Sequence, residues 1–256
     1  MEYHVLSFAS IILGLAYFLA GIVDGACGGG GLITMSVLMI LGVPAHNIAP
    51  TNQASLAPGC LTSFVTFARS GKIDWKPSLI AVPFAIIGGI FGAKLNLIIP
   101  ANVLKIIMLI LVPVIGAVVI LKKDIGKESR IETLSSAKVA IYAALIGLVV
   151  GGYQGFYGAG SGTLFMFGFA LLLRMDLVTA SGCTKVLCLS AILSATVTYI
   201  FSGKIIWLMV PVCMVFSILG NYVGSKLALT KGAKVIRPMF IAVLIGLIIK
   251  LFCDII

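Results

Sequence analysis

The sequence predicts an all-α polytopic membrane protein built from two inverted repeats. Hydrophobic residues make up 61% of the 256 residues and charged residues only 10%, with a mean hydropathy of +1.20. Soluble domains are about one quarter charged, so this composition is typical of a chain that lies mostly in lipid. The apolar residues form runs separated by short polar connections, and the two halves of the chain resemble each other.

The internal duplication becomes visible when the two halves are superposed with a shift of 132 residues. Residues 70–73, Ser-Gly-Lys-Ile, then fall on the same four residues at 202–205. Further matches bring Gly28, Gly30, Leu32, Gly88 and Gly92 onto Gly160, Gly162, Leu164, Gly220 and Gly224. Chance matches between single glycines are easy, but a register held from residue 28 to residue 105 indicates a duplicated unit.

Each half divides into five apolar segments, with breaks at glycine, proline and clusters of charge. In the first half they cover residues 3–24, 30–43, 49–68, 76–98 and 101–121. In the second half they cover residues 137–155, 162–175, 179–201, 206–228 and 235–253. A membrane-spanning helix needs about 20 apolar residues. The second segment of each half is shorter and follows a glycine-rich break, so it is either a compressed span or a re-entrant half-helix.

The distribution of Lys and Arg favours an odd number of crossings in each half. With five spans, or three spans and a re-entrant pair, thirteen Lys and Arg residues lie on one side and four on the other. Four spans per half give ten against seven, a weaker bias than the positive-inside rule expects. We therefore expect one membrane domain, 1–256, in a prokaryotic cell membrane. Repeat one covers about 1–122, a cytoplasmic linker about 123–136 and repeat two about 137–256, with both termini outside.

Composition also bears on partners and cofactors. The net charge of +10 lies in connections between segments, so it predicts membrane topology and not nucleic-acid binding. The six cysteines form no CxxC pair and no ligand spacing with histidine. We therefore expect no metal, no cofactor and no catalytic residue, and we leave open whether the protein is a homodimer.

Two glycine-rich stretches lie at corresponding places in the halves. The first contains Gly28, Gly29, Gly30 and Gly31, and the second contains Gly160, Ser161, Gly162 and Thr163. Glycine lets a helix unwind and lets a ligand approach the backbone amides, and a helix that starts there presents N–H groups to an anion. Paired breaks of this kind indicate a transporter's binding site. Close helix packing is the competing explanation.

A second pair of stretches supplies polar side chains. Thr51, Asn52 and Gln53 follow Pro50, which we expect at a helix start, and the 132-residue shift places Gln53 on Lys185, next to Thr184. A cation near the bilayer centre costs about 2.5–3.5 kcal/mol, so it normally faces a cavity or a partner. Together these groups are hydrogen-bond donors suited to a small oxyanion. Helix capping and snorkelling of Lys185 to the interface are the alternatives.

Asp24 is the only acid in the first glycine stretch. It is the obvious ion-pair partner of Lys185, and a role in proton coupling is the second interpretation. The 132-residue shift pairs Asp24 with Phe156, so any function of Asp24 is confined to one half.

The combined motifs resemble the TauE/SafE family, also called sulfite exporter-like. The resemblance rests on GACGGGGLI (25–33) with APTNQAS (49–55), and on GFYGAGSGTLF (155–165) with SGCTKV (181–186). It covers nearly the whole chain and implies transport of small sulfur-containing anions, such as sulfite, sulfonates or sulfoacetate, usually out of the cell. Gln53 and Ser161 depart from the symmetric pattern, which implies an asymmetric anion site.

We therefore expect a secondary transporter that binds a small anion between the repeats and works by alternating access. A passive anion channel would use the same donors. A membrane-embedded thiol or metal enzyme, or an assembly factor with Cys27 and Cys183 as its reactive groups, is the less favoured alternative.

Overall fold

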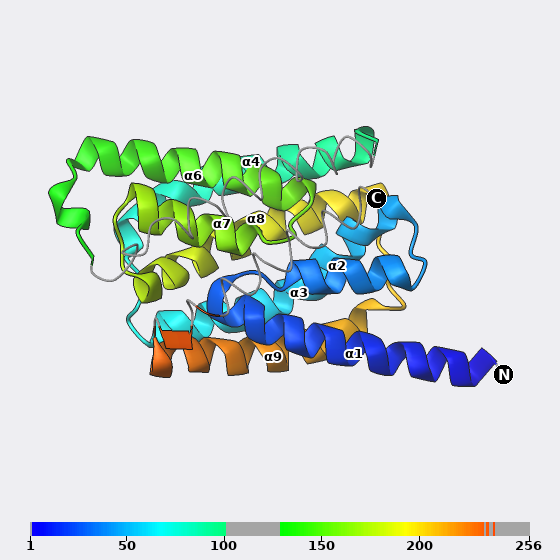
Figure 1. Cartoon of the computed structure of the whole chain (residues 1–256). Helices are drawn as coiled ribbons and strands as arrows, with labels where there is room; N and C mark the ends of the chain where they lie inside the picture. Colours follow the sequence, from blue (N-terminus) through cyan, green and yellow to red (C-terminus); the bar gives the residue numbers. More distant parts are fainter. Residues whose placement is uncertain (1, 101–128, 233, 236–237, 239–256) are drawn as a thin grey trace, which may run out of the picture.

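The computed structural model describes residues 2–100, 129–232, 234–235 and 238, with side chains from residue 11 onward, and this part of the chain is helical without strands (Figure 1). The predicted fifth segments, 101–121 and nearly all of 235–253, lie outside the described residues. In the first half the helices are α1 (Glu2–Cys27), α2 (Gly31–Ile40), α3 (Ala45–Arg69) and α4 (Trp75–Ile98). In the second half they are α6 (Ser136–Phe156), α7 (Ser161–Phe167), α8 (Leu177–Ser202) and α9 (Val210–Lys231). A 3₁₀ turn, η1 (Ile131–Thr133), precedes α6, and a π-helical turn, η2 (Gly168–Leu172), extends α7.

Polar side chains cap the helices at the membrane surface. The Asp176 carboxylate accepts hydrogen bonds of 3.0 Å from the Val178 and Thr179 amides at the start of α8, and Asp74 caps α4 in the same way. Such caps satisfy amides that have no partner inside the helix. Among the described helices, α4, α6, α8 and α9 are long and apolar enough to cross a membrane.

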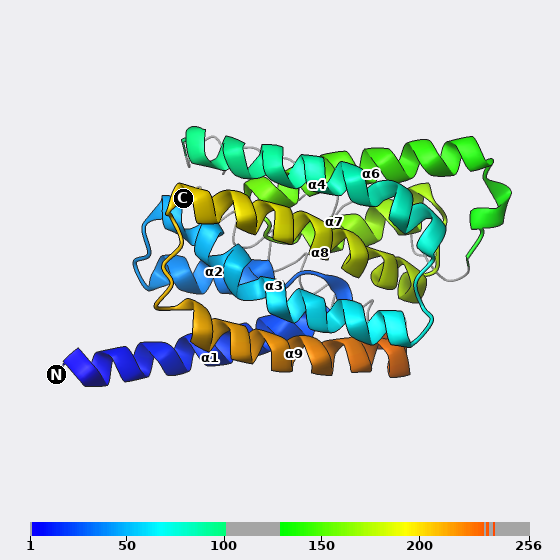
Figure 2. The same ribbon diagram turned by 180° about the vertical axis from the view of Figure 1, so that it is seen from behind.

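The short second segments form re-entrant helices. At a rise of about 1.5 Å per residue, the ten residues of α2 cover about 15 Å, half of a hydrocarbon core of about 30 Å. Figures 1 and 2 show α2 running back towards the end of the bundle from which α1 enters, where α3 also begins. The α6 and α7 helices do the same from the opposite end. Each half therefore contains a re-entrant pair followed by spanning helices.

The two halves are inverted and intertwined. Equivalent helices run in opposite directions, as the ribbon shows for α1 and α6 (Figure 1). The main packing partner of α1 is α9, and the equivalent partner of α6 is α4. Likewise α3 packs on α9 while α8 packs on α4, and α3 meets α8 at the centre. The described helices thus form two bundles, α1–α3–α9 and α6–α8–α4, each of which contains one helix from the other half.

Close backbone contacts show that the register between the halves is not uniform. A Cβ on Gly25 would lie 2.5 Å from the Asn221 carbonyl oxygen, and one on Gly155 would lie 2.1 Å from that of Gly89. Gly25 and Gly155 are 130 residues apart, whereas Gly89 and Asn221 are 132 apart. The predicted shift of 132 therefore applies to α4 and α9 but is wrong for α1 and α6. The two additional residues of the second half lie in α7 and η2, which together hold twelve residues against ten in α2. A π-helical turn is a known way to accommodate extra residues.

Candidate functional site

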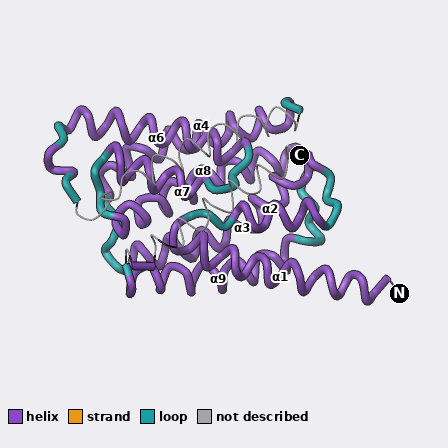
Figure 3. Tube along the Cα trace, viewed as in Figure 1, coloured by secondary structure: helices purple, strands orange, loops and turns teal. Residues whose placement is uncertain are grey.

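The two glycine breaks lie against each other inside the bundle. Figure 3 shows both as loops between helices in the interior, one after α1 and one after α6. The Thr163 amide donates a 3.1 Å hydrogen bond to the Gly28 carbonyl, and a Cβ on Gly162 would lie 2.5 Å from the Gly28 Cα. Gly28 ends α1 with φ +83° and Gly158 follows α6 with the same φ, a conformation that favours glycine. Non-helical backbone at this depth is therefore enclosed by protein, as the membrane requires.

Side chains from other helices satisfy the last carbonyls of α1. The last four carbonyls of a helix have no partner within it. At the end of α1, four successive carbonyls each accept a hydrogen bond from a side chain: Asp24 from Lys185, Gly25 from Ser225 at 3.4 Å, Ala26 from Ser181 at 2.9 Å and Cys27 from Thr163 at 3.3 Å. This break is held by donors from α7, α8 and α9.

The end of α6 is held in the same way. Its carbonyls accept from side chains of the first half and of α8: Gln154 from Gln53, Gly155 from Tyr199 at 2.6 Å and Phe156 from Asn96 at 2.6 Å. Lys185 and Gln53 thus make the same kind of contact, each with a carbonyl of the other half. The equivalence of Lys185 and Gln53 that the sequence predicts agrees with these contacts.

Lys185 is buried in the third turn of α8, with 2% of its surface exposed. An ammonium can donate three hydrogen bonds, and within the described residues its one acceptor is the Asp24 carbonyl. No carboxylate oxygen in that part of the chain lies within 4.0 Å of it. A cation at the negative end of the α1 dipole is favourable. The protein therefore fixes one donor of Lys185 and leaves the other two for a ligand.

Asp24 is half-buried at the end of α1. Its charge interacts with that of Lys185, and the Gly30 amide lies against its carboxylate. Its counterpart follows from the 130-residue register of α1 and α6 and is Gln154. The pairing of Asp24 with Phe156 by the 132-residue shift is therefore wrong, because the offset was taken from other helices.

In the second half the corresponding side chains form a neutral network. Gln154 Nε2 donates to Gln53 Oε1 at 3.3 Å, Gln53 donates to the Gln154 carbonyl, and Ser161 donates to Gln154 Oε1. The equivalent positions of the first half hold Asp24 and Lys185. One break thus carries two opposite charges and the other carries two amides, so the centre is chemically asymmetric.

Three of the expected polar residues use their side chains elsewhere. The Thr184 hydroxyl donates 2.8 Å to Ala180 of its own helix. The Asn52 oxygen accepts from Tyr17 at 2.9 Å, and the Thr51 hydroxyl accepts from the Ile206 amide at 3.0 Å. The expectation that Pro50 starts the helix is wrong, because α3 begins at Ala45 after Pro44, and Pro50 lies inside it. Thr51, Asn52 and Gln53 are therefore beyond the first turn of α3.

The glycine stretches place backbone amides beside Lys185 and Gln53. Gly30 and Gly160 are the N-cap residues of α2 and α7. The Ile33 amide donates to the Gly30 carbonyl at 3.0 Å. Gly29 lies next to Gly30 in the same buried turn. Among the described residues, the amides of Gly31 and Gly162 have no recorded acceptor.

Sequence reasoning missed several polar residues that shape this centre. Tyr17, Asn96, Gln154 and Tyr199 are nearly or fully buried, and each donates to a group of the other helices. A buried network of Ser63, Asn221 and Ser225 joins α3 to α9, with Ser63 Oγ donating to Asn221 Oδ1 at 2.7 Å and Ser225 Oγ to Ser63 Oγ at 2.9 Å. The available signal was a polar residue inside an otherwise apolar segment.

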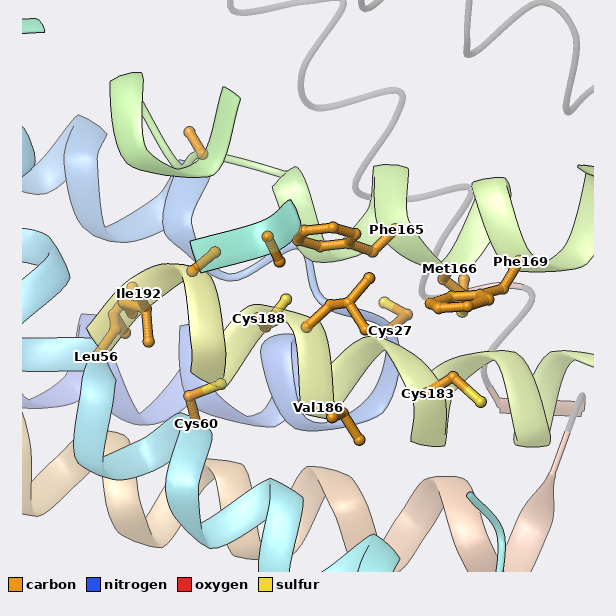
Figure 4. Packing of buried hydrophobic residues seen from close by; sticks show 14 of the residues in the cluster. Cys27, Leu56, Cys60, Phe165, Met166, Phe169, Cys183, Val186, Cys188 and Ile192 are labelled. Atoms are coloured by element: carbon orange, nitrogen blue, oxygen red, sulfur yellow. The ribbon is translucent and has the colours of Figure 1, made fainter. Parts of the chain in front are cut away.

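The cysteines lie among apolar side chains. Figure 4 shows Cys27, Cys183 and Cys188 near Phe165 and Phe169 in the core between α7 and α8. Cys183 Sγ contacts the Asp74 carbonyl at 3.6 Å. The described part of the chain holds no group of three or more His, Cys, Asp or Glu side chains able to bind a metal ion.

Comparison with known proteins places this architecture in a family. The family model described as sulfite exporter TauE/SafE matches residues 13–251. The chain belongs to the TauE/SafE family. Its fold and site are therefore those of a membrane transporter of that family, and it is not an enzyme. A protein of Sinorhizobium named probable membrane transporter protein ORF9 is 31% identical, over 99% of this chain and 95% of its own length.

Further relatives carry similar names. The probable membrane transporter protein YfcA of Escherichia coli is 32% identical, over 95% of this chain and 91% of its own. The probable membrane transporter protein YdhB of Bacillus subtilis is 27% identical, over 83% of this chain and 87% of its own. No solved structure matches the chain.

Proposed function

We propose that this TauE/SafE protein is a secondary transporter that exports small sulfur-containing anions, such as sulfite, sulfonates or sulfoacetate. The observation that carries the proposal is Lys185, a buried cation beside two apposed helix breaks, with two donors left over after its bond to the Asp24 carbonyl. A buried cation is costly unless it has a partner or a ligand. An anion that accepts charge-assisted hydrogen bonds from Lys185 fits this requirement.

The backbone supports the same choice of ligand. The amide of Gly31 opens the ten-residue helix α2 in the same interior region and has no recorded acceptor in the described chain. A helix N-terminus attracts anions. The family name adds the chemical class, a sulfur oxyanion. Compact anions with several oxygen acceptors match one ammonium and nearby amides, whereas larger organic cations do not.

The packing suggests which bodies move during alternating access. The bundles α1–α3–α9 and α6–α8–α4 each contain helices of both halves. We propose that these two bundles rock against each other, in place of one sequence repeat rocking against the other. Their shared boundary is the α3–α8 contact and the apposition of Gly28 with Gly162. The site then lies at the pivot, as in other inverted-repeat transporters.

The orientation is part of the proposal. Figure 1 places the α3–α4 turn, the start of α6 and the end of α9 at one end of the bundle. Basic residues gather at that end, and the described ones include Arg69, Lys72, Lys138 and Lys231. The positive-inside rule makes it the cytoplasmic end. The N-terminus of α1 lies at the opposite end (Figure 1) and is then outside.

Ligand-dependent thermal stability tests the substrate class. Purified protein is melted with sulfite, sulfate, taurine or sulfoacetate, because a ligand at 100 times its Kd stabilises the folded state by about 2.7 kcal/mol. The anion that stabilises the protein most is then followed into proteoliposomes. Lys185→Gln is expected to abolish both stabilisation and flux. The control Lys204→Gln removes an exposed lysine of the α8–α9 turn and should leave both unchanged.

Two results would contradict the proposal. Equal stabilisation and flux in Lys185→Gln would remove Lys185 from the site, and failure of every anion to stabilise the wild-type protein would reject the substrate class. Flux that shows no stimulation by anion on the opposite side of the membrane would indicate a passive channel in place of a carrier.

A further inference from the structure

The two helix breaks differ in one chemical respect. By the 130-residue register of the first helices and the 132-residue register of α3 and α8, Asp24 is equivalent to Gln154 and Lys185 to Gln53. Both halves use the same contact, a side chain of the third or eighth helix that donates to a last-turn carbonyl. The amides of Gln53 and Gln154 show that this contact needs no charge. The charges of Asp24 and Lys185 therefore require a separate explanation.

The geometry separates the anchoring of Lys185 from its neutralisation. Its ammonium is anchored to the Asp24 carbonyl oxygen. The Asp24 carboxylate lies against the Gly30 amide and acts on Lys185 through its charge, without a direct ion pair. An incoming anion can therefore bind the ammonium without first breaking a salt bridge. The carboxylate is nevertheless close enough to balance the cation when no anion is bound.

The surrounding helices offer no other counter-charge among the described residues. The α2 and α7 sequences contain no titratable side chain. The titratable groups that interact with the Asp24 and Lys185 charges are the thiols of Cys27, Cys60 and Cys188. On α9, the exposed Lys226 lies over the Tyr222 ring, 5.5 Å from its centroid. Within this part of the chain, Asp24 is the one anion that balances Lys185.

We propose that Asp24 is the internal counter-anion of the empty transporter. Resting on the anion site proposed above, the inference is that the substrate neutralises Lys185 in the loaded state and the Asp24 carboxylate neutralises it in the empty state. The empty protein can then change its access without an uncompensated charge in a medium of low dielectric constant. Asp24 is thus required for net transport but not for one-for-one exchange of anions, in which the transporter changes access only when loaded.

The experiment compares exchange with net efflux in proteoliposomes, using the anion that stabilises the wild-type protein most among sulfite, sulfate, taurine and sulfoacetate. Three variants are measured: Asp24→Asn, Lys185→Gln and the double variant, whose side chains resemble the neutral Gln53 and Gln154. For Asp24→Asn, we expect exchange within about twofold of wild type and net efflux at least about tenfold lower. Lys185→Gln and the double variant should lose both activities.

Each outcome decides between the two proposals. Equal loss of exchange and net efflux in Asp24→Asn, or unchanged net efflux, would overturn the role of Asp24 while leaving the anion site intact. Transport by Lys185→Gln at wild-type rates would overturn the anion site itself, and with it this inference. Melting temperatures check folding, because the double variant has balanced charges and should melt no lower than Lys185→Gln. If no anion stabilises the wild-type protein, both proposals fail.

Discussion

Gly28 of α1 and Gly162 of α7 lie backbone against backbone, with the Gly28 carbonyl accepting from the neighbouring Thr163 amide at 3.1 Å. This contact joins the two halves where both re-entrant pairs turn. A side chain at either glycine would separate the breaks, because a Cβ on Gly162 would lie 2.5 Å from the Gly28 Cα. The glycines therefore serve close approach as well as chain reversal.

Gly162→Ala should destabilise the fold and impair transport. Overpacking costs typically about 1–3 kcal/mol, and here the clash is with backbone that cannot rotate away. The measurement is the melting temperature in detergent together with anion flux. Gly152→Ala is the matched control, since the nearest atom to its Cβ is 3.9 Å away and alanine is favoured over glycine in a helix by about 0.5–1 kcal/mol. Equal melting temperatures for the two variants would contradict the contact.

Thr184→Val should leave anion binding unchanged, although Thr184 is adjacent to Lys185. Its hydroxyl donates to the Ala180 carbonyl of its own helix at 2.8 Å and not to the breaks. Loss of such a bond costs about 0.5–1.5 kcal/mol of stability, but the affinity should stay within about twofold of wild type. Titration of the stabilising anion measures this. A large fall in affinity would show that Thr184 turns towards the ligand and would restore the expectation from the sequence.

The apolar segments could be predicted from the sequence because hydropathy is set by composition. The third segment was expected at 49–68 and is Ala45–Arg69 in the structure. The start was placed too late because Pro50 resembles a helix-initiating proline, while Pro44 before α3 carries that role. The consequence was functional, since Thr51 and Asn52 were assigned to a first turn where their donors would face an anion.

The register of the first helices could not be obtained from sequence identities. Gly28 matches Gly160 at a shift of 132 and Gly158 at a shift of 130 equally well, because the breaks are rich in glycine. Packing decides between them: a Cβ on Gly220 would lie 2.2 Å from the Phe18 carbonyl oxygen, and one on Gly88 would lie 2.5 Å from that of Leu148. Only the tertiary contacts show that Asp24 corresponds to Gln154.

Asn221→Ala should destabilise the α1–α3–α9 bundle. Asn221 accepts from Ser63 Oγ at 2.7 Å and donates to the Ser217 carbonyl at 3.0 Å. Hydrogen bonds between membrane helices contribute about 0.6–2 kcal/mol, so the variant should melt at a lower temperature. The control is Thr198→Val, whose hydroxyl donates at 2.9 Å only to the Ser194 carbonyl of its own helix. If Thr198→Val destabilised the protein as much, the network would have no special role.

The turns at Lys72 and Lys204 provide a direct test of the inverted topology and its orientation. They occupy equivalent positions, 132 residues apart, and both side chains are exposed. Figure 1 places the α3–α4 turn and the α8–α9 turn at opposite ends of the bundle. The positive-inside rule puts Lys72 in the cytoplasm and Lys204 outside. A membrane-impermeant maleimide should therefore label Lys204→Cys on intact cells and Lys72→Cys only after permeabilisation.

The native cysteines allow a clean background for this labelling. Cys27, Cys60, Cys183, Cys188 and Cys213 are buried in the structure, and Cys253, outside the described residues, is replaced by serine. The opposite labelling pattern would reverse the orientation but keep the fold. Labelling of both positions from the same side would contradict the inverted repeat itself, because an equivalent turn of an inverted repeat has to emerge on the other side of the membrane.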